Sequence, residues 1–419
     1  SGGLASVSTS PVLTIRAPDD FSPLHSSRPA RQAFAARLAS PRDGAAVTFL
    51  DFYQQDIQRL EQAGRRRALA LPAGRDFSSN DYLGLAGSDV LRGAAIAALE
   101  RGVPLGSGGS RLLRGHGSEH QALEEEAARF FGAASALYVG SGFAANSLLF
   151  ATLPQPDDLI LYDALIHASA HEGMRLSRAP ARSFEHNDVA AAEAAIAEWR
   201  REGGRGTVWI AFETLYSMDG DTAPVAEFAA LAERESPMLL VDEAHAVGAC
   251  GPHGRGLAAG LQGRDNAVLL ATCGKALGCE GALILAPAPL REFLINRGRS
   301  FIFSTAPSPL MAAVVRAALA ETAVADERRT RLQTLIATAK TAFAPLGITP
   351  SGTHIQPIIL GDDTHCMTVA AALQARGFDV RGIRPPSVPP GTARLRVSIT
   401  LNTDEAAIHA LAAILKELL

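Results

Sequence analysis

The chain lacks a strong excess of charge of either sign and any apolar run long enough to cross a membrane. It has 419 residues, with 39 lysine or arginine residues against 43 aspartate or glutamate residues, for a formal net charge of -4. A mildly acidic balance gives no electrostatic attraction to nucleic acid, which needs clustered basic residues. No stretch of about 18 uninterrupted apolar residues occurs, so no membrane-spanning helix is expected. We predict a soluble protein with no nucleic-acid or membrane partner.

Cysteine is also scarce. The chain has four cysteines and no CxxC pair, which argues against a disulfide framework and against a structural zinc site. Isolated thiols suit a reducing compartment, and we therefore expect the protein to be cytoplasmic. The cysteines are Cys250, Cys273, Cys279 and Cys366.

Two pairs of histidines have the i, i+4 spacing with which a helix can hold a metal ion. The pairs are His116 with His120 and His167 with His171. No third ligand accompanies either pair, and no HExxH motif occurs, so we predict no metal site. A GxSxG nucleophile elbow and a Walker A phosphate loop are absent as well.

The first 46 residues differ in composition from the rest of the chain. They are rich in serine, proline, arginine and alanine and show no sustained periodicity. We predict a disordered leader or a tag-derived segment at 1–46, because the opening Ser1-Gly2-Gly3 is typical of vector-derived residues. The arginines also allow an organelle-targeting segment, although Asp19 and Asp20 weaken that interpretation.

Residues 47–75 are predicted to form an N-terminal helix or arm. The apolar residues Phe49, Phe52, Ile57 and Leu60 recur at the spacing of an amphipathic helix. The three arginines at 65–67 follow, either as a solvated helix end or as part of a site for an anionic acyl chain or CoA.

Residues 76–306 alternate between strand-like and helix-like segments, and we predict a large domain there. Near-continuous apolar runs of strand length are typical of strands that are buried on both faces of a mostly parallel sheet, with helices on each side. The predicted fold class is therefore α/β. Helices are expected at 143–153, 166–176 and 225–235, and strands at 136–140, 158–162, 207–212, 238–241, 269–271 and 282–285.

Residues 307–419 are predicted to form a smaller C-terminal α+β domain. A long helical stretch is expected at about 310–343, followed by a strand at 355–360. A helix at 367–374, a strand at 394–400 and a final helix complete this domain.

A glycine-containing turn between a strand and a helix is the first candidate site. Residues 140–145 fit the pattern GxGxxA, and Asp163 follows 21 residues after Gly142. This resembles a dinucleotide fingerprint, in which the aspartate would hold a ribose hydroxyl of a nicotinamide cofactor. The N–H groups of a helix N-terminus would equally bind another phosphate, and a tight turn without a ligand is the remaining interpretation.

An acidic strand end and a lysine form the second candidate site. The apolar strand at 238–241 leads to Asp242 and His245, and a buried carboxylate there is costly unless it meets a cation. Lys275 follows another strand in a turn of small residues, where we expect it to form a Schiff base; a solvated surface lysine is the alternative. A Schiff-base lysine, an aspartate for a ring nitrogen and a helix N-terminus for a phosphate together predict a pyridoxal 5'-phosphate (PLP) site.

Residues 49–419 resemble the α-oxoamine synthase family of fold-type I PLP enzymes. The similar segments lie at 77–84 (FSSNDYLG), 106–111 (GSGGSR), 217–221 (SMDGD) and 303–305 (FST), together with those around Asp242 and Lys275. The resemblance implies a fold-type I transferase with a large PLP-binding domain and a smaller C-terminal domain. It also implies a homodimer with the active site at the subunit interface.

The resemblance further implies roles around the cofactor. Lys275 would carry PLP covalently and then transfer protons at the α-carbon of the amino acid, while Asp242 would keep the ring nitrogen protonated. His167 would stack on the ring. Contacts to the phenolic oxygen or the phosphate are implied for Gly142, Phe143, Glu213, Ser217, His245, Thr272 and, from the neighbouring subunit, Thr305.

A substrate pair is implied as well. The segment at 383–396 is most similar to family members that join L-alanine to a pimeloyl thioester, on CoA or a carrier protein, in biotin biosynthesis. Arg396 would bind the amino-acid carboxylate, and Arg394, on the same strand face, would make structural contacts. The alternatives are glycine or serine with another acyl-CoA, or a nicotinamide-dependent oxidoreductase. Further substrate contacts are implied for Arg65, Asn80, His167 and Ser387.

Overall fold

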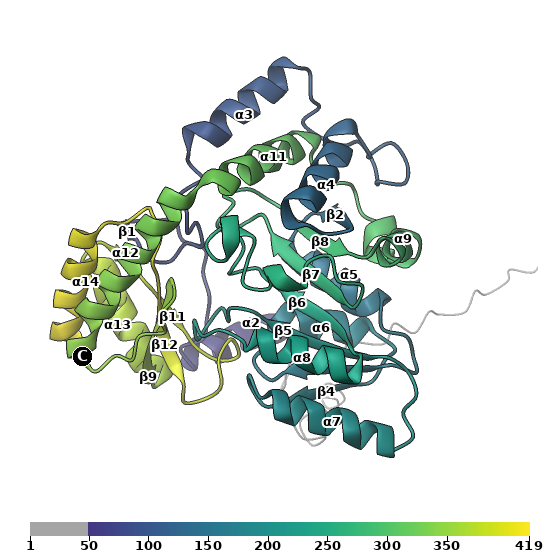
Figure 1. Ribbon diagram of the computed structural model, residues 1–419. Helices are drawn as coiled ribbons and strands as arrows, with labels where there is room; N and C mark the ends of the chain where they lie inside the picture. The colour runs from purple at the N-terminus through teal and green to yellow at the C-terminus, as the bar shows by residue number, and fades with distance from the viewer. Residues whose placement is uncertain (1–48) are drawn as a thin grey trace, which may run out of the picture. The chain divides into compact units, whose positions relative to one another are not determined.

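The computed structural model describes residues 49–419 (Figure 1). The predicted leader at 1–46 lies outside the described residues. The chain divides into two units, Ser1–Arg67 and Ala68–Leu419, and each is described by itself. In the first unit, α2 (Phe49–Gln62) confirms the helix predicted from apolar spacing. Residues 49–419 include no helix with both the length and the apolarity needed to cross a bilayer.

The second unit contains a seven-stranded sheet with the strand order β2-β8-β7-β6-β5-β3-β4. β3 pairs in parallel with β4 and β5, β5 with β6, and β6 with β7, whereas β8 runs antiparallel to both of its neighbours. This arrangement confirms the mostly parallel sheet of an α/β fold. The strands are β2 (Ser135–Val139), β3 (Leu159–Asp163), β4 (Ala181–Phe184), β5 (Val208–Glu213), β6 (Met238–Asp242), β7 (Ala267–Thr272) and β8 (Ala282–Ala286).

Helices cover both faces of this sheet because its strands turn alternate apolar side chains to each side. Ile160, Trp209 and Leu240 belong to the core that α5, α6 and α9 close, whereas Leu161 and Ile210 belong to the core that α7 and α8 close. The helices before residue 307 are α3 (Asp89–Glu100), α4 (Ser118–Phe131), α5 (Gly142–Thr152), α6 (Ala168–Leu176), α7 (Val189–Arg201), α8 (Val225–Glu235), η1 (Pro252–Gly254), η2 (Ala259–Leu261), α9 (Ala288–Arg297) and α10 (Arg299–Ile302).

The C-terminal part contains an antiparallel sheet with the order β11-β12-β9, and Figure 1 shows α12, α13 and α14 grouped with it. β1 (Arg75–Asp76) pairs in parallel with β10 (Phe378–Asp379), so the start of the predicted large domain is bonded to C-terminal residues. The predicted domain boundaries stay predictions. The elements are α11 (Pro309–Val324), α12 (Asp326–Phe343), η3 (Ala344–Leu346), β9 (Ile355–Gly361), α13 (Asp363–Ala375), β11 (Arg381–Ile383), β12 (Ala393–Ser398) and α14 (Glu405–Leu418).

The structure differs from the sequence prediction in two places. The helical stretch expected at about 310–343 is confirmed, but it consists of two helices, because Ala325, with φ -81° and ψ 34°, separates α11 from α12. The buried guanidinium of Arg329 donates to the carbonyl oxygen of Thr322 at 2.8 Å and so satisfies the end of α11. β4 and α7 occupy an interval between 176 and 207 in which the sequence analysis predicted no element.

Candidate active site

Four polar residues end neighbouring parallel strands of the large sheet. Asp163, Glu213, Asp242 and Thr272 are the last residues of β3, β5, β6 and β7. Parallel strands end at the same edge of a sheet, so these side chains come together there. The loops that follow these strands bring further predicted site residues to this edge, namely His167, Ser217, His245 and Lys275.

The start of α5 lies beside the end of β7. The hydroxyl of Ser141 caps the helix by accepting a hydrogen bond from the Ala144 N–H at 3.1 Å. A Cβ atom added to Gly142 would lie 3.6 Å from Oγ1 of Thr272, so this hydroxyl is close to the first turn of the helix. Helix N-termini attract anions, and a hydroxyl beside one adds a donor. The predicted phosphate contacts at Gly142, Phe143 and Thr272 therefore have suitable chemistry.

Lys275 lies half-buried beside His245. Its Nζ atom is 2.6 Å from Nε2 of the imidazole. Burial lowers the pKa of Lys275 to about 8, although the negative charge of Asp242 acts in the opposite direction. An amine with a lowered pKa is partly neutral near neutral pH, which is the form that a nucleophile or a base requires.

Asp242 is buried, and its two oxygens accept different hydrogen bonds. Oδ1 accepts from the Ala244 N–H at 2.9 Å, and Oδ2 accepts from Nδ2 of Asn146 at 2.8 Å. The same amide donates to Oγ of Ser169 at 2.9 Å, and this hydroxyl lies 2.8 Å from Nδ1 of His167. Within residues 49–419 no lysine or arginine forms an ion pair with Asp242. Its charge is therefore available to a cationic group of a ligand.

Glu213 lies in register with Asp242 on the adjacent strand. Burial raises the pKa of the Glu213 carboxyl well above its usual range, and the charge of Asp242 raises it further. Its Oε1 atom is buried and has no hydrogen-bond partner among the described residues. A neutral carboxyl group can donate as well as accept, so Glu213 can bind one more polar atom at this edge.

Arg396, on β12, reaches toward the loop that follows β5. Its Nε donates to the carbonyl oxygen of Ser217 at 2.6 Å, and its Nη1 to Oγ of Ser398 at 2.8 Å. Its Nη2 donates to Oδ1 of Asn80 at 3.0 Å and to the hydroxyl of Tyr82 at 3.3 Å. All of these acceptors are neutral, so the guanidinium can still bind a carboxylate.

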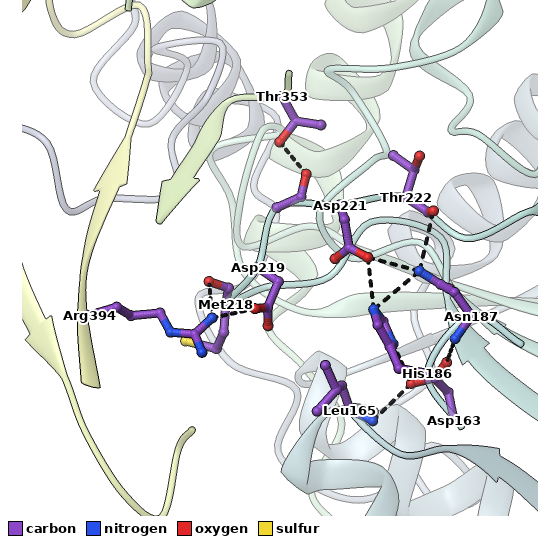
Figure 2. A network of polar contacts seen from close by, with 11 residues as sticks. Asp163, Leu165, His186, Asn187, Met218, Asp219, Asp221, Thr222, Thr353 and Arg394 are labelled. Carbon is purple, nitrogen blue, oxygen red and sulfur yellow. Dashed lines mark hydrogen bonds and ion pairs between the residues drawn. The ribbon is translucent and has the colours of Figure 1, made fainter. Parts of the chain in front are cut away.

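Arg394 reaches the same loop from the same face of β12, as the spacing predicts. Its Nη1 donates to the carbonyl oxygen of Met218 at 3.3 Å and forms an ion pair with Asp219 (Figure 2). Its charge therefore already has a carboxylate partner in the protein, whereas that of Arg396 does not.

Figure 2 also shows the loop after β5 tied to the end of β3. Nδ1 of His186 lies 2.8 Å from Oδ1 of Asp163, and Nε2 lies 2.8 Å from Oδ2 of Asp221. Asn187 donates to both carboxylates, also at 2.8 Å. Burial lowers the pKa of His186, but the two carboxylates outweigh it and raise this pKa to about 10. An imidazolium therefore holds the loop that carries Ser217.

The dinucleotide interpretation of the 140–145 turn required Asp163 to hold a ribose. The Asp163 side chain is instead 0% exposed. It accepts from the N–H groups of Leu165 and Asn187 at 2.8 Å and contacts His186. Because protein donors occupy this carboxylate, it is not available to a ribose hydroxyl.

Arg65 belongs to the first unit, Ser1–Arg67. Two predicted site residues of the second unit contact other parts of the structure. Ser387 is exposed in the turn between β11 and β12, and its N–H donates to the carbonyl oxygen of Arg384 at 3.1 Å. Thr305 is exposed and forms an isolated bridge with Ser110. The roles of Arg65, Ser387 and Thr305 stay predictions.

The first of the two histidine pairs, His116 with His120, binds protein groups. Nδ1 of His116 accepts from Nε of Arg111, and Nδ1 of His120 accepts from the Gly117 N–H, both at 3.1 Å. Within residues 49–419 no three histidine, cysteine or acidic side chains gather in a way that could hold a metal ion.

Four residues of this region were not predicted from the sequence. Asn146 and Ser169 link Asp242 to His167, Tyr82 contacts His245, and His186 anchors the loop after β5. Asn146 lies one turn after Gly142 on α5, so its helix position was a usable signal. Tyr82 and His186 meet partners far away in the sequence and had no such signal.

The side chains at this edge fit PLP. A half-buried lysine can bond to its aldehyde, and the buried Asp242 can balance a protonated ring nitrogen. Thr272 and the start of α5 can hold a phosphate, and the orphaned Oε1 of Glu213 can accept one more polar contact.

Comparison with known proteins agrees with this chemistry. The family model for aminotransferase class I and II matches residues 74–414. A relative from Burkholderia ambifaria (strain MC40-6), named 8-amino-7-oxononanoate synthase, is 40% identical over 393 residues, which cover 88% of this chain and 87% of that protein. A protein of the same name from Geobacter sulfurreducens is also 40% identical and covers 87% of this chain and 97% of its own length.

Solved structures share the fold. A serine palmitoyltransferase from S. paucimobilis, with a bound PLP–myriocin aldimine, has a TM-score of 0.80 and 25% identity, and covers 90% of this chain and 98% of that one. An 8-amino-7-oxononanoate synthase from Francisella tularensis has a TM-score of 0.69 and 26% identity, and covers 82% and 97%. The chain belongs to the aminotransferase class I and II family, as a fold-type I, PLP-dependent acyltransferase of the α-oxoamine synthase group that includes the 8-amino-7-oxononanoate synthases.

Proposed function

We propose that this protein condenses L-alanine with a pimeloyl thioester, with loss of carbon dioxide, in biotin biosynthesis. The products are 8-amino-7-oxononanoate, carbon dioxide and the free thiol of the acyl carrier. The observation that carries the proposal is 40% identity, over most of both chains, to relatives named for this product. A half-buried lysine, a buried aspartate and an arginine with neutral partners, all near one another, support it.

PLP, when bound, supplies an electron-withdrawing ring that stabilises negative charge at the α-carbon of the amino acid. Lys275 holds the cofactor and then moves the α-proton, for which a pKa of about 8 suits it. Asp242 stabilises positive charge at the ring nitrogen, and His167 covers one face of the ring. Arg396 binds the alanine carboxylate and orients the α-carbon toward Lys275.

The remaining predicted residues complete the cofactor site and the substrate site. Thr272, Gly142 and Phe143 hold the phosphate, with Thr305 of the neighbouring subunit of a homodimer. Glu213, Ser217 and His245 contact the ring substituents, while Asn80 supports the amino-acid site. Arg65 and Ser387 line the acyl pocket. CoA or a carrier protein delivers the acyl group, and we expect the reaction to take place in the cytoplasm.

Two measurements test this function. Borohydride reduction of the PLP-loaded protein, followed by peptide mapping, should leave a pyridoxyl group on Lys275 and none in Lys275→Ala. A steady-state assay then compares alanine with glycine and serine, each with pimeloyl-, acetyl-, succinyl- and palmitoyl-CoA. We expect alanine and pimeloyl-CoA to give the highest kcat/KM. Equal turnover of serine with palmitoyl-CoA would instead favour the activity named for the solved structural neighbour.

A further inference from the structure

A chain of polar contacts joins the amine of Lys275 to the guanidinium of Arg396. Nζ of Lys275 lies 2.6 Å from Nε2 of His245, and Nδ1 of the same ring lies 2.7 Å from the hydroxyl of Tyr82. This hydroxyl accepts a hydrogen bond from Nη2 of Arg396 at 3.3 Å. It has a further acceptor within reach, since Oδ1 of Asn80 is 3.0 Å away. Tyr82 thus contacts Arg396 directly, and it reaches Lys275 through the ring of His245.

The ring of Tyr82 is held so that its hydroxyl stays on His245. The ring is 0% exposed, and the ring of His354 packs against it with centroids 3.9 Å apart. Burial raises the pKa of Tyr82 to about 12, so the hydroxyl keeps its proton. Burial and the charge of Lys275 lower the pKa of His245 well below its usual range, so this imidazole is neutral and carries one N–H.

One hydroxyl proton and one imidazole proton allow two fully satisfied arrangements. When Lys275 is neutral, Tyr82 donates to Nδ1 of His245, and the Nε2–H donates to the amine. When Lys275 is protonated, the amine donates to Nε2, the Nδ1–H donates to the hydroxyl oxygen, and the hydroxyl proton turns to Asn80. The direction of the Tyr82 hydroxyl therefore changes with the protonation of Lys275.

Arg396 favours the neutral arrangement as long as it binds no carboxylate. Its positive charge lowers the pKa of Lys275, and its Nη2 donates to Oδ1 of Asn80 and to the hydroxyl oxygen of Tyr82. Each of these oxygens has a second lone pair, so the bonds from Arg396 weaken, rather than block, the two bonds that the protonated arrangement needs. A carboxylate bound to the guanidinium draws these N–H groups away and neutralises a nearby positive charge. Both oxygens then become better acceptors, and Lys275 binds a proton more tightly.

We propose that Tyr82 is a positioning residue that transmits the binding of a carboxylate at Arg396 to the amine of Lys275, through the ring of His245. The proposal rests on the proposed function, in which Arg396 binds the amino acid and Lys275 takes its α-proton. A higher pKa increases the driving force for transfer of the α-proton to Lys275, once the amine has lost its own proton. The other titratable groups that face these side chains are Asp242, Glu213, His167, Cys250 and His354.

The composition of the chain makes the amine measurable. Only three lysines occur, and Lys340 and Lys416 are exposed. Cofactor-free protein is pulse-labelled with acetic anhydride across a pH series, and mass spectrometry gives the rate at Lys275, with the two exposed lysines as internal references. Only the neutral amine reacts, so a rise of about one unit in pKa slows labelling about tenfold at a pH below that pKa. Propionate, a carboxylate without an amine, is compared with sodium chloride of equal ionic strength.

We expect propionate to slow the labelling of Lys275 by about three- to tenfold in the parent protein and to leave the two reference lysines unchanged. The effect should disappear in Arg396→Gln. In Tyr82→Phe the logarithm of the propionate-induced slowing should fall to less than about half of its parental value, because the hydroxyl that links Arg396 to the ring of His245 is gone. Tyr162→Phe is the matched control. It removes a different tyrosine hydroxyl, on β3, and should keep the full effect.

Asn80→Ala gives a second variant in which the Tyr82 ring stays in place, and it should weaken the propionate effect as well. We call the path from Arg396 through Tyr82 and His245 to Lys275 the relay. The relay is overturned if propionate does not slow the labelling of Lys275 in the parent protein. It is also overturned if the propionate effect is undiminished in Tyr82→Phe or, should Tyr82→Phe not fold, undiminished in Asn80→Ala. These results are separate from those that test the proposed function, because the labelling needs no PLP. A pyridoxyl group on Lys275 and normal turnover, together with an undiminished effect in Tyr82→Phe, would refute the relay alone, whereas a missing pyridoxyl group would refute the function.

Discussion

The imidazolium of His186 carries a testable prediction about the loop that Arg396 contacts. Glutamine at this position leaves Asp163 with the N–H groups of Leu165 and Asn187 but without a cation. Asp163 is 0% exposed, and removal of the partner of a buried charge costs about 3–5 kcal/mol. The two retained N–H bonds and the 26% exposure of the His186 side chain reduce that cost. We expect His186→Gln to lower the free energy of unfolding by about 2–3 kcal/mol.

The pH dependence of this difference identifies its cause. The Asp163 and Asp221 carboxylates overcome the effect of burial and raise the pKa of His186 in the folded protein to about 10, against about 6.5 in the unfolded chain. A group with a raised folded pKa gives its full stabilisation below the unfolded pKa and loses it as the pH rises through the folded pKa. The difference in stability between the parent and His186→Gln should therefore be largest near about pH 6 and shrink by more than half by about pH 9.

Urea unfolding, followed by circular dichroism across this pH range, measures the difference. His409→Gln, at an exposed position of α14, is the matched control and should change stability by less than about 0.5 kcal/mol at every pH. A difference for His186→Gln that stays constant from about pH 6 to about pH 9 would refute the reasoning, because it would show that the folded protein gains nothing from the charge of His186.

Three further variants test the site and its support. Asp242→Asn, in PLP-loaded protein, should slow α-proton exchange of alanine in deuterated water by at least about a hundredfold, and exchange at the parental rate would remove Asp242 from its role at the ring nitrogen. Arg396→Ala should raise the apparent KM for alanine by about 10- to 100-fold with PLP still bound, whereas Arg394→Ala should mainly lower stability; the reverse result would mean that the wrong arginine was chosen. Gly173→Ala should cost about 1–3 kcal/mol in thermal unfolding, because a Cβ there would lie 2.8 Å from the carbonyl oxygen of Asn146, while Gly93→Ala, with open space around it, should be neutral or stabilising.

The sequence by itself determined the local elements and the chemical class of the site. Long apolar runs predict buried parallel strands, because only strands covered on both faces tolerate them. Three features of the site lie directly beside a predicted helix or strand in the sequence: the glycine turn before α5, the acid that ends β6 and the lysine that follows β7. These local features and the family resemblance were therefore enough to predict PLP chemistry and its fold, both of which the comparisons confirm.

Tertiary structure alone decided how these residues are held, since the supporting contacts join distant segments. Tyr82 and His245 are 163 positions apart, and Arg396 and Ser217 are 179 apart. No periodicity or propensity encodes such pairs, because they depend on how strands and loops pack around a common edge. Packing also supports the break at Ala325, because the buried guanidinium of Arg329 donates to the carbonyl oxygen of the distant Gly248 as well as to that of Thr322. Local patterns and the family resemblance thus predicted the PLP chemistry, and packing decided which of the predicted residues touch.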